Sequence, residues 1–200
     1  MQSYLLPYHV TLSGEKIVMI GLKNIIGYKA KGKIQATPIV WNNAGQWVIS
    51  GGGKDATDSN EQVAAMREFF EETGVDFRLR TQLEYYGFHS KIITKLFPLG
   101  SSSPDYSVTY IQFEDYNGLA QDINRNIRTG NVSDDELHEV TWMRPDAAKR
   151  SLGLPQVSTN GWMRPPIHDA QSKLTDADKI LKRQMNKPWN WFEVAIDNLP

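Results

Sequence analysis

The chain has 200 residues, 40% of them hydrophobic and 22% charged, which is an ordinary composition for a soluble globular domain. The formal net charge of −1 gives no overall attraction to nucleic acid or to an anionic membrane, so phosphate recognition would have to be local. The chain has no cysteine, which excludes disulfides, thiolate metal sites and a cysteine nucleophile.

The first fifty residues contain apolar runs separated by turn signals, a pattern typical of short antiparallel strands. The predicted strands are residues 3–12, 16–22, 34–41 and 46–50.

A lysine-rich stretch separates the first two predicted strands from the next two. It contains Lys23, Lys29, Lys31 and Lys33, set among glycines. These lysines offer either cations for a polyphosphate or the charges of an ordinary solvated loop.

Three consecutive glycines, Gly51 to Gly53, follow the fourth strand and predict a flexible turn whose backbone can lie close to a ligand. A helix is predicted next. Ser59 and Gln62 have the spacing of a capping box at its start, and Gly74 has the position of a helix C-terminus.

This helix carries an acidic stripe opposite its apolar face. Glu68, Glu71 and Glu72 are three and four residues apart, so their carboxylates can converge on a small volume. Like charges at this spacing repel one another and favour a bound cation, and oxygen ligands suit hard divalent ions. A solvated acidic face is the alternative explanation.

The run Arg67-Glu-Phe-Phe-Glu-Glu-Thr-Gly-Val75 resembles the second half of the Nudix box, Arg-Glu-hydrophobic-x-Glu-Glu-x-Gly-hydrophobic. Gly53 lies at the spacing of the leading glycine of the box. The resemblance implies that Arg67, Glu68, Glu71 and Glu72 are catalytic. It also implies that the three glutamates, with the Gly53 carbonyl, bind Mg²⁺ or Mn²⁺.

One position departs from the box, because Ser59 stands where the family has an isolated glutamate that braces the arginine. Asp55, Asp58 or Glu61 can replace that brace from nearby. Ser59 itself is either a helix cap or the sign of a changed metal shell.

The second half of the chain continues with predicted strands and helices. Residues 76–88 are predicted as strands, 115–131 as a polar loop with a short helix, and 133–139 as a capped segment before a last strand. The remaining elements are strands at 91–97, 106–113 and 140–143, helices at 144–148 and 175–185, and an aromatic cluster at 189–192.

The resemblance implies an α/β (α+β) Nudix fold, with a mixed sheet between helices. We expect residues 1–150 to form the Nudix domain. Residues 151–200 would then be an extension packed on the same domain or on the partner in a homodimer.

Further substrate contacts are expected from loops around the predicted helix. Tyr86, with Tyr85 and His89, is a candidate contact to a base or sugar, although core packing is the alternative for the tyrosines. Glu136 or Glu139 can add a metal contact or orient water. The full set of candidate substrate-binding residues is Lys33, Lys54, Tyr86, Glu136 and Glu139.

The predicted function is a metal-dependent Nudix pyrophosphohydrolase that cleaves a nucleoside diphosphate linked to another moiety, with ADP-ribose-like compounds or nucleotide sugars as preferred substrates. The alternative is a catalytically impaired Nudix-fold nucleotide-binding or regulatory module. A third hypothesis is a protein or RNA partner for the C-terminal segment, and it rests only on the aromatic residues and on Lys179, Lys182 and Arg183. Residues 1–9 lack the basic start of a signal peptide and no apolar run is long enough to span a membrane, so we expect a cytoplasmic protein.

Overall fold

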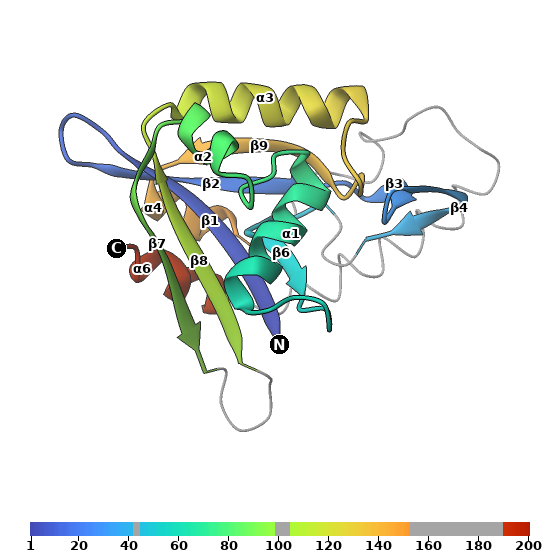
Figure 1. Cartoon of the computed structure of the whole chain (residues 1–200), viewed down its shortest axis with the longest axis horizontal. Coiled ribbons are helices and arrows are strands. Elements are labelled where there is room, and N and C mark those ends of the chain that lie inside the picture. Colours follow the sequence, from blue (N-terminus) through green and yellow to red (C-terminus); the bar gives the residue numbers. More distant parts are fainter. Residues whose placement is uncertain (42–44, 99–104, 153–189) are drawn as a thin grey trace.

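A computed structural model describes residues 1–41, 45–98, 105–152 and 190–200 (Figure 1). Its centre is a mixed sheet in the order β5-β2-β1-β8-β7, with β6 paired to β1 and β9 paired to β2. β1 and β8 run parallel, and the other pairs in this sheet are antiparallel. Its strands are β1 (Gln2–Val10), β2 (Lys16–Lys23), β5 (Trp47–Val48), β6 (Ser50–Gly53), β7 (Phe88–Phe97), β8 (Tyr106–Phe113) and β9 (Leu137–Met143).

Helices cover both faces of this sheet. Strand side chains alternate between faces, so Tyr110 and Phe113 of β8 point to opposite sides. The Tyr110 hydroxyl donates to the Ala195 carbonyl of α6 at 2.7 Å, whereas Phe113 packs 4.8 Å from Phe77, which itself stacks on Phe69 of α1. The predicted mixed sheet between helices is confirmed. The helices are α1 (Glu61–Thr73), α2 (Arg80–Tyr85), α3 (Tyr116–Thr129), α4 (Pro145–Ser151) and α6 (Asn190–Asp197).

A separate two-stranded hairpin, β3 (Ile26–Ala30) and β4 (Lys33–Val40), extends to one side of the main sheet in Figure 1. The carboxylate of Asp135 holds β3 near the turn by accepting from the backbone N–H of Tyr28 at 2.7 Å and of Lys29 at 3.1 Å. A side chain at Gly27 would lie 2.2 Å from that carboxylate, so only glycine allows this close approach.

Three local predictions were wrong. Gly51 to Gly53 belong to strand β6 and pair with β1, so they do not form a turn. Residues 80–85 of the region predicted as strands form helix α2, because Leu83 and Tyr86 are buried one turn apart. The predicted loop at 115–131 is almost entirely helix α3, which begins at the Asp115 cap.

The predicted capping box is also wrong by one residue. The N-cap of α1 is Asn60, which has extended backbone angles and accepts from the Val63 N–H at 2.9 Å. The predicted end is confirmed, since Gly74 has a φ of 73° and donates to the Phe70 carbonyl at 2.8 Å.

The described part of the C-terminal segment packs against the sheet. In α6, Phe192 is 2% exposed, and its ring lies 5.5 Å from that of Tyr4 in an edge-to-face contact. The helix predicted at residues 175–185 lies outside the described residues, as does residue 189. Over the described ranges, no helix has the length and apolar character needed to cross a membrane.

Candidate active site

Helix α1 presents a polar face because its other face is buried in the core. Ala65, Met66 and Phe69 are at most 3% exposed, and this burial turns Arg67, Glu68 and Glu71 away from the sheet interior. The last turn is held by the loop before β9. In that loop the backbone N–H groups of Ser133 and Asp134 donate to the Glu71 carbonyl at 2.9 and 2.8 Å.

Strand β6 brings its backbone against this polar face. A Cβ on Gly52 would lie 2.5 Å from Glu68 Oε2, so Glu68 occupies the space that a side chain would fill. Gly51 has a φ of 150° and would place a Cβ 2.4 Å from the Ser3 carbonyl oxygen. Gly53 is exposed, and its carbonyl accepts from Arg67 Nη2 at 2.9 Å.

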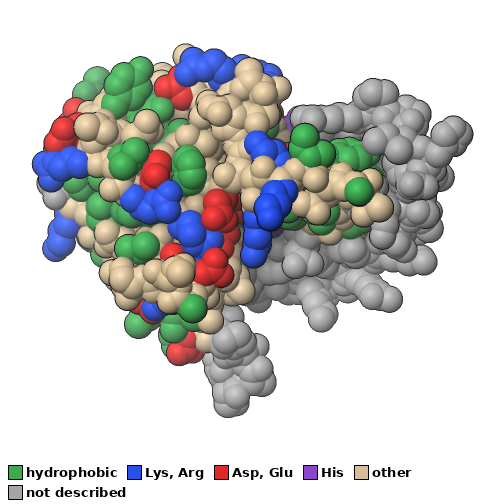
Figure 2. Space-filling model, turned by 45° about the vertical axis from the view of Figure 1, so that its right-hand side comes forward, with side chains coloured by type: hydrophobic (Ala, Val, Ile, Leu, Met, Phe, Trp, Pro, Cys, Tyr) green, Lys and Arg blue, Asp and Glu red, His purple; other side chains and the backbone are tan. Residues whose placement is uncertain are grey.

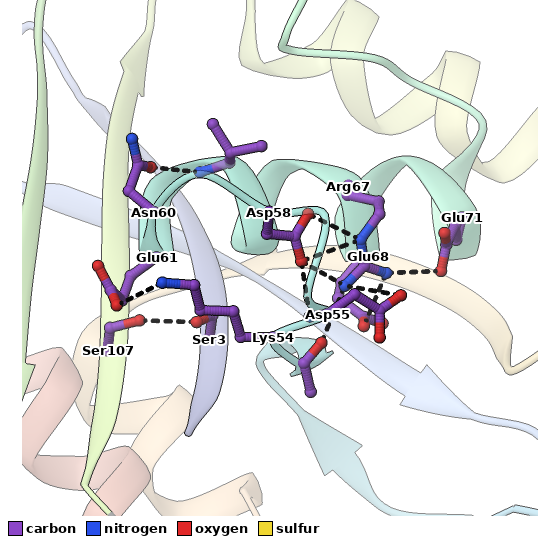
Figure 3. A network of polar contacts seen from close by, with 12 residues as sticks. Ser3, Lys54, Asp55, Asp58, Asn60, Glu61, Arg67, Glu68, Glu71 and Ser107 are labelled. Atoms are coloured by element: carbon purple, nitrogen blue, oxygen red, sulfur yellow. Dashed lines mark hydrogen bonds and ion pairs between the residues drawn. The ribbon is translucent and has the colours of Figure 1, made fainter.

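Asp58 supplies the brace for Arg67 (Figure 3). Its two carboxylate oxygens accept from Nε at 3.1 Å and from Nη2 at 2.9 Å, while the nearest oxygen of Asp55 lies 3.8 Å from Nη2. This bond holds the pKa of Asp58 below its ordinary value and raises that of Arg67. Glu61 pairs with Lys54 instead, at 3.0 Å, and Ser59 is exposed.

Two of the three predicted glutamates come together on Arg67. Its Nη1 donates to Glu68 at 2.9 Å and to Glu71 at 3.1 Å. Burial raises the pKa of Glu68, and the neighbouring guanidinium opposes that rise.

Glu72 lies on the inner side of the helix, where its residue is 2% exposed. It accepts a hydrogen bond from the hydroxyl of Ser50. Burial raises the pKa of Glu72 to about 7, although the charge of nearby Lys23 and the Ser50 hydroxyl oppose that rise. Burial also lowers the pKa of the Lys23 ammonium, which pairs with Glu136.

A pocket of about 280 Å³ opens beside the outer face of α1. One side, the helix wall, consists of Asp55, Arg67, Glu68 and Glu71. The other side, the hairpin wall, consists of Lys31, Gly32, Ser133 and Asp134. Figure 2 shows acidic and basic side chains next to one another on the molecular surface.

Several predicted site residues lie outside the lining of this pocket. Glu72 and Glu136 belong to the buried cluster with Lys23. Tyr86 is 4% exposed, and its hydroxyl donates to Asp122 at 2.9 Å, so it is part of the core. Lys33, Lys54 and Glu139 are likewise not in the lining, and the side chain of His89 lies outside the described part of the chain.

Sequence reasoning missed Ser133 and Asp134 as site residues. The run of residues 133–136 has the composition of a helix cap. In the structure its first residues are instead hydrogen-bonded to the last turn of α1 and to the hairpin turn. Burial raises the pKa of Asp134, which adds another poorly compensated carboxylate to the pocket. An acidic run just before a strand is a weak signal of a site residue, because no local sequence pattern shows that the run contacts α1.

The donor set fits a hard divalent cation. Glu68, Glu71 and Asp134 supply carboxylate oxygens around one pocket, and the pKa of two of them is raised by burial, so added positive charge would stabilise them. Within the described residues, no three acidic or histidine side chains are already gathered closely enough to hold a metal ion. In this arrangement Glu68 and Glu71 each form an ion pair with Arg67.

The α+β fold therefore places two acidic side chains and a braced arginine of one helix on a single pocket, with a glycine strand beside that helix. The family model described as "NUDIX domain" matches residues 37–161, and the chain belongs to the Nudix family. The protein is therefore a hydrolase of phosphoanhydride bonds, and the resemblance in the box is confirmed. No match was found among curated proteins.

Solved structures with a similar fold share little sequence with the chain. A mutT/nudix family protein from Listeria innocua is 16% identical over 92% of this chain and 94% of that chain, with a TM-score of 0.44. The Ap4A hydrolase of C. elegans is 15% identical over 91% and 97%, with a TM-score of 0.37. The NUDIX domain of Shewanella oneidensis NrtR, solved with ADP ribose, is 8% identical over 89% and 84%, with a TM-score of 0.35. These low values leave the substrate open.

Proposed function

We propose that this protein is a divalent-metal-dependent pyrophosphohydrolase that cleaves a nucleoside diphosphate linked to a second moiety. The observation that carries the proposal is the helix wall, where Glu68 and Glu71 face a pocket beside an arginine braced by Asp58. Mg²⁺ or Mn²⁺ would be held by Glu68 and Glu71, with Asp134 as a further oxygen donor from the opposite wall. Glu72 would join them by turning from its Ser50 contact.

A bound divalent ion would supply charge neutralisation for the phosphate oxygens and a lower pKa for attacking water. The protein's own residues do the rest. Asp58 holds Arg67, and Arg67 holds Glu68 and Glu71 within one small volume. A carboxylate that the metal leaves free would accept the proton from water.

The test is turnover of a nucleotide panel with and without MgCl₂ or MnCl₂. The panel begins with ADP-ribose and nucleotide sugars and includes dinucleoside polyphosphates and nucleoside triphosphates. We expect metal-dependent release of a nucleoside monophosphate or of phosphate from at least one compound. No turnover of any compound with either metal would refute the proposal.

A nucleotide-binding or regulatory module is the second candidate, because Ser59 replaces the box glutamate and the described acids are not gathered around one point. The Asp58 brace weighs against it, since Arg67 keeps a carboxylate partner despite the substitution. Saturable binding of a panel compound without any turnover would favour the module.

A further inference from the structure

The turn that joins β3 to β4 brings a lysine to the pocket. Lys31 and Gly32 have φ values of 51° and 72°, so both adopt the left-handed backbone of a tight hairpin turn. Among the described residues, Lys31 is the one residue other than glycine with positive φ. Glycine fits such a position better because it has no Cβ to approach the following carbonyl oxygen, and asparagine offsets that contact with local hydrogen bonds.

Three contacts press this turn against the loop before β9. The Lys31 backbone N–H donates to the Asp134 carboxylate, and the Gly32 N–H donates to the Ser133 carbonyl at 2.9 Å. The ammonium of Lys29 donates to the Gly130 carbonyl at 3.1 Å. The turn is therefore fixed opposite α1, and Lys31 is one of the residues that line the pocket.

The other lysines of this region are engaged elsewhere. Lys23 is buried against Glu136, Lys29 is bound to backbone carbonyls, and Lys33 is exposed outside the pocket lining. In the described residues, the ammonium of Lys31 has no ion-pair partner. Its backbone N–H, by contrast, is bonded.

The second cation of the pocket is already committed. Arg67 makes bonds to Asp58, to the Gly53 carbonyl and to two glutamates, which leaves it little capacity to bind a ligand. We propose that Lys31 binds phosphate oxygens of the substrate from the hairpin wall, opposite the carboxylates of the helix wall. This proposal rests on the function proposed above and assigns the phosphate contact to Lys31 in place of Lys33.

A substitution can separate the charge of Lys31 from its backbone conformation. Lys31→Asn removes the ammonium and places at this position a residue that tolerates the left-handed region, so the fold should be as stable as the wild type or slightly more stable. Lys31→Arg keeps the charge. Lys33→Asn is the matched control, since it removes a lysine from the same hairpin outside the pocket.

The binding experiment uses imidodiphosphate, a non-hydrolysable diphosphate, titrated calorimetrically into the full-length protein in MgCl₂. We expect Kd to rise about tenfold in Lys31→Asn, to stay within about twofold in Lys33→Asn, and to be largely restored in Lys31→Arg. With a turned-over substrate, Lys31→Asn should raise KM and leave kcat nearly unchanged. Unchanged affinity in Lys31→Asn, or an equal loss in both asparagine variants, would overturn the proposal.

The outcomes distinguish this proposal from the proposed hydrolysis. Diphosphate binding that depends on Lys31, without turnover of any nucleotide, would support the phosphate contact and refute the hydrolytic activity. Turnover with an unchanged KM in Lys31→Asn would support hydrolysis and refute the role of Lys31. Absence of both binding and turnover in the wild type would refute both.

Discussion

The two walls of the pocket are built in different ways. Contacts in the helix wall are local in sequence, since Arg67 and its brace Asp58 are nine residues apart. Contacts in the hairpin wall are long-range, since Lys31 and the Asp134 carboxylate are 103 residues apart. The geometry of the helix wall is therefore set mostly within one short segment, whereas that of the hairpin wall depends on the whole fold.

This difference leads to an expectation about function. Changes in the helix wall should act mainly on the rate of the chemical step, because its carboxylates are the groups that we propose to bind the metal. Changes in the hairpin wall should act mainly on substrate affinity.

Glu71→Gln should have the largest effect and lower kcat by about a hundredfold or more. It removes the negative charge of a carboxylate that we propose to bind the metal. The fold should persist, because the side chain is 24% exposed. Steady-state kinetics with circular dichroism measure both. Glu61→Gln, on the same helix outside the pocket, is the control, and a loss smaller than about tenfold in Glu71→Gln would show that the metal assignment is wrong.

Asp58→Asn should destabilise the protein by about 2–3 kcal/mol, because it leaves the Arg67 guanidinium without its buried counter-charge. The Asp58 side chain is 3% exposed, so water cannot replace the lost bond. Urea unfolding measures the change, and kcat should fall with it. Ser59→Glu, one residue later and exposed, should be tolerated; a larger effect at Ser59 than at Asp58 would contradict the assigned brace.

Gly52→Ala should reduce kcat/KM by about tenfold with little loss of stability, because the new methyl displaces Glu68 from its place beside β6. Its Cβ would lie 2.5 Å from Glu68 Oε2, whereas a Cβ on Gly53 would find its nearest neighbour 4.0 Å away. Gly53→Ala is therefore the matched control. Equal activity of the two alanine variants would show that the position of Glu68 does not matter.

Asp135→Asn should affect the hairpin wall and raise KM severalfold, with kcat almost unchanged. The neutral amide is a weaker acceptor for the Tyr28 and Lys29 N–H groups, so we expect a loss of about 1 kcal/mol in stability. Kinetics and thermal unfolding measure the two effects. Glu139→Gln, an exposed change on β9, is the control and should alter neither KM nor stability. A fall in kcat for Asp135→Asn would show that the hairpin wall also affects the chemical step.

Asn60→Ala should have the smallest effect, a loss of about 1 kcal/mol of stability from the missing helix cap. The Asn60 side chain accepts from the Val63 N–H at 2.9 Å on the solvent side of α1. Chemical denaturation is the measurement, with Ser59→Ala as control. A greater loss of stability for Ser59→Ala than for Asn60→Ala would show that Ser59 is the helix cap, as the sequence predicts.

Several features of the site could be predicted from sequence because they depend on local spacing. Helix periodicity places Glu68 and Glu71 on one face, and a glycine ends the helix where its left-handed angles are needed. The choice between Ser59 and Asn60 as cap could not be made, because both are good caps and the loop geometry decides which side chain faces the free N–H groups.

The amino-acid sequence by itself determined the family, the acidic helix and the need for an acidic partner for Arg67. Only the tertiary structure decided that Asp58 is that partner, that Glu72 faces the interior and that the hairpin turn meets the acids. The physical reason is the range of the interactions. A helix turn repeats every few residues, so its faces can be read from spacing. The approach of residues 31 and 134 depends instead on how the sheet and the hairpin pack, which no local pattern encodes.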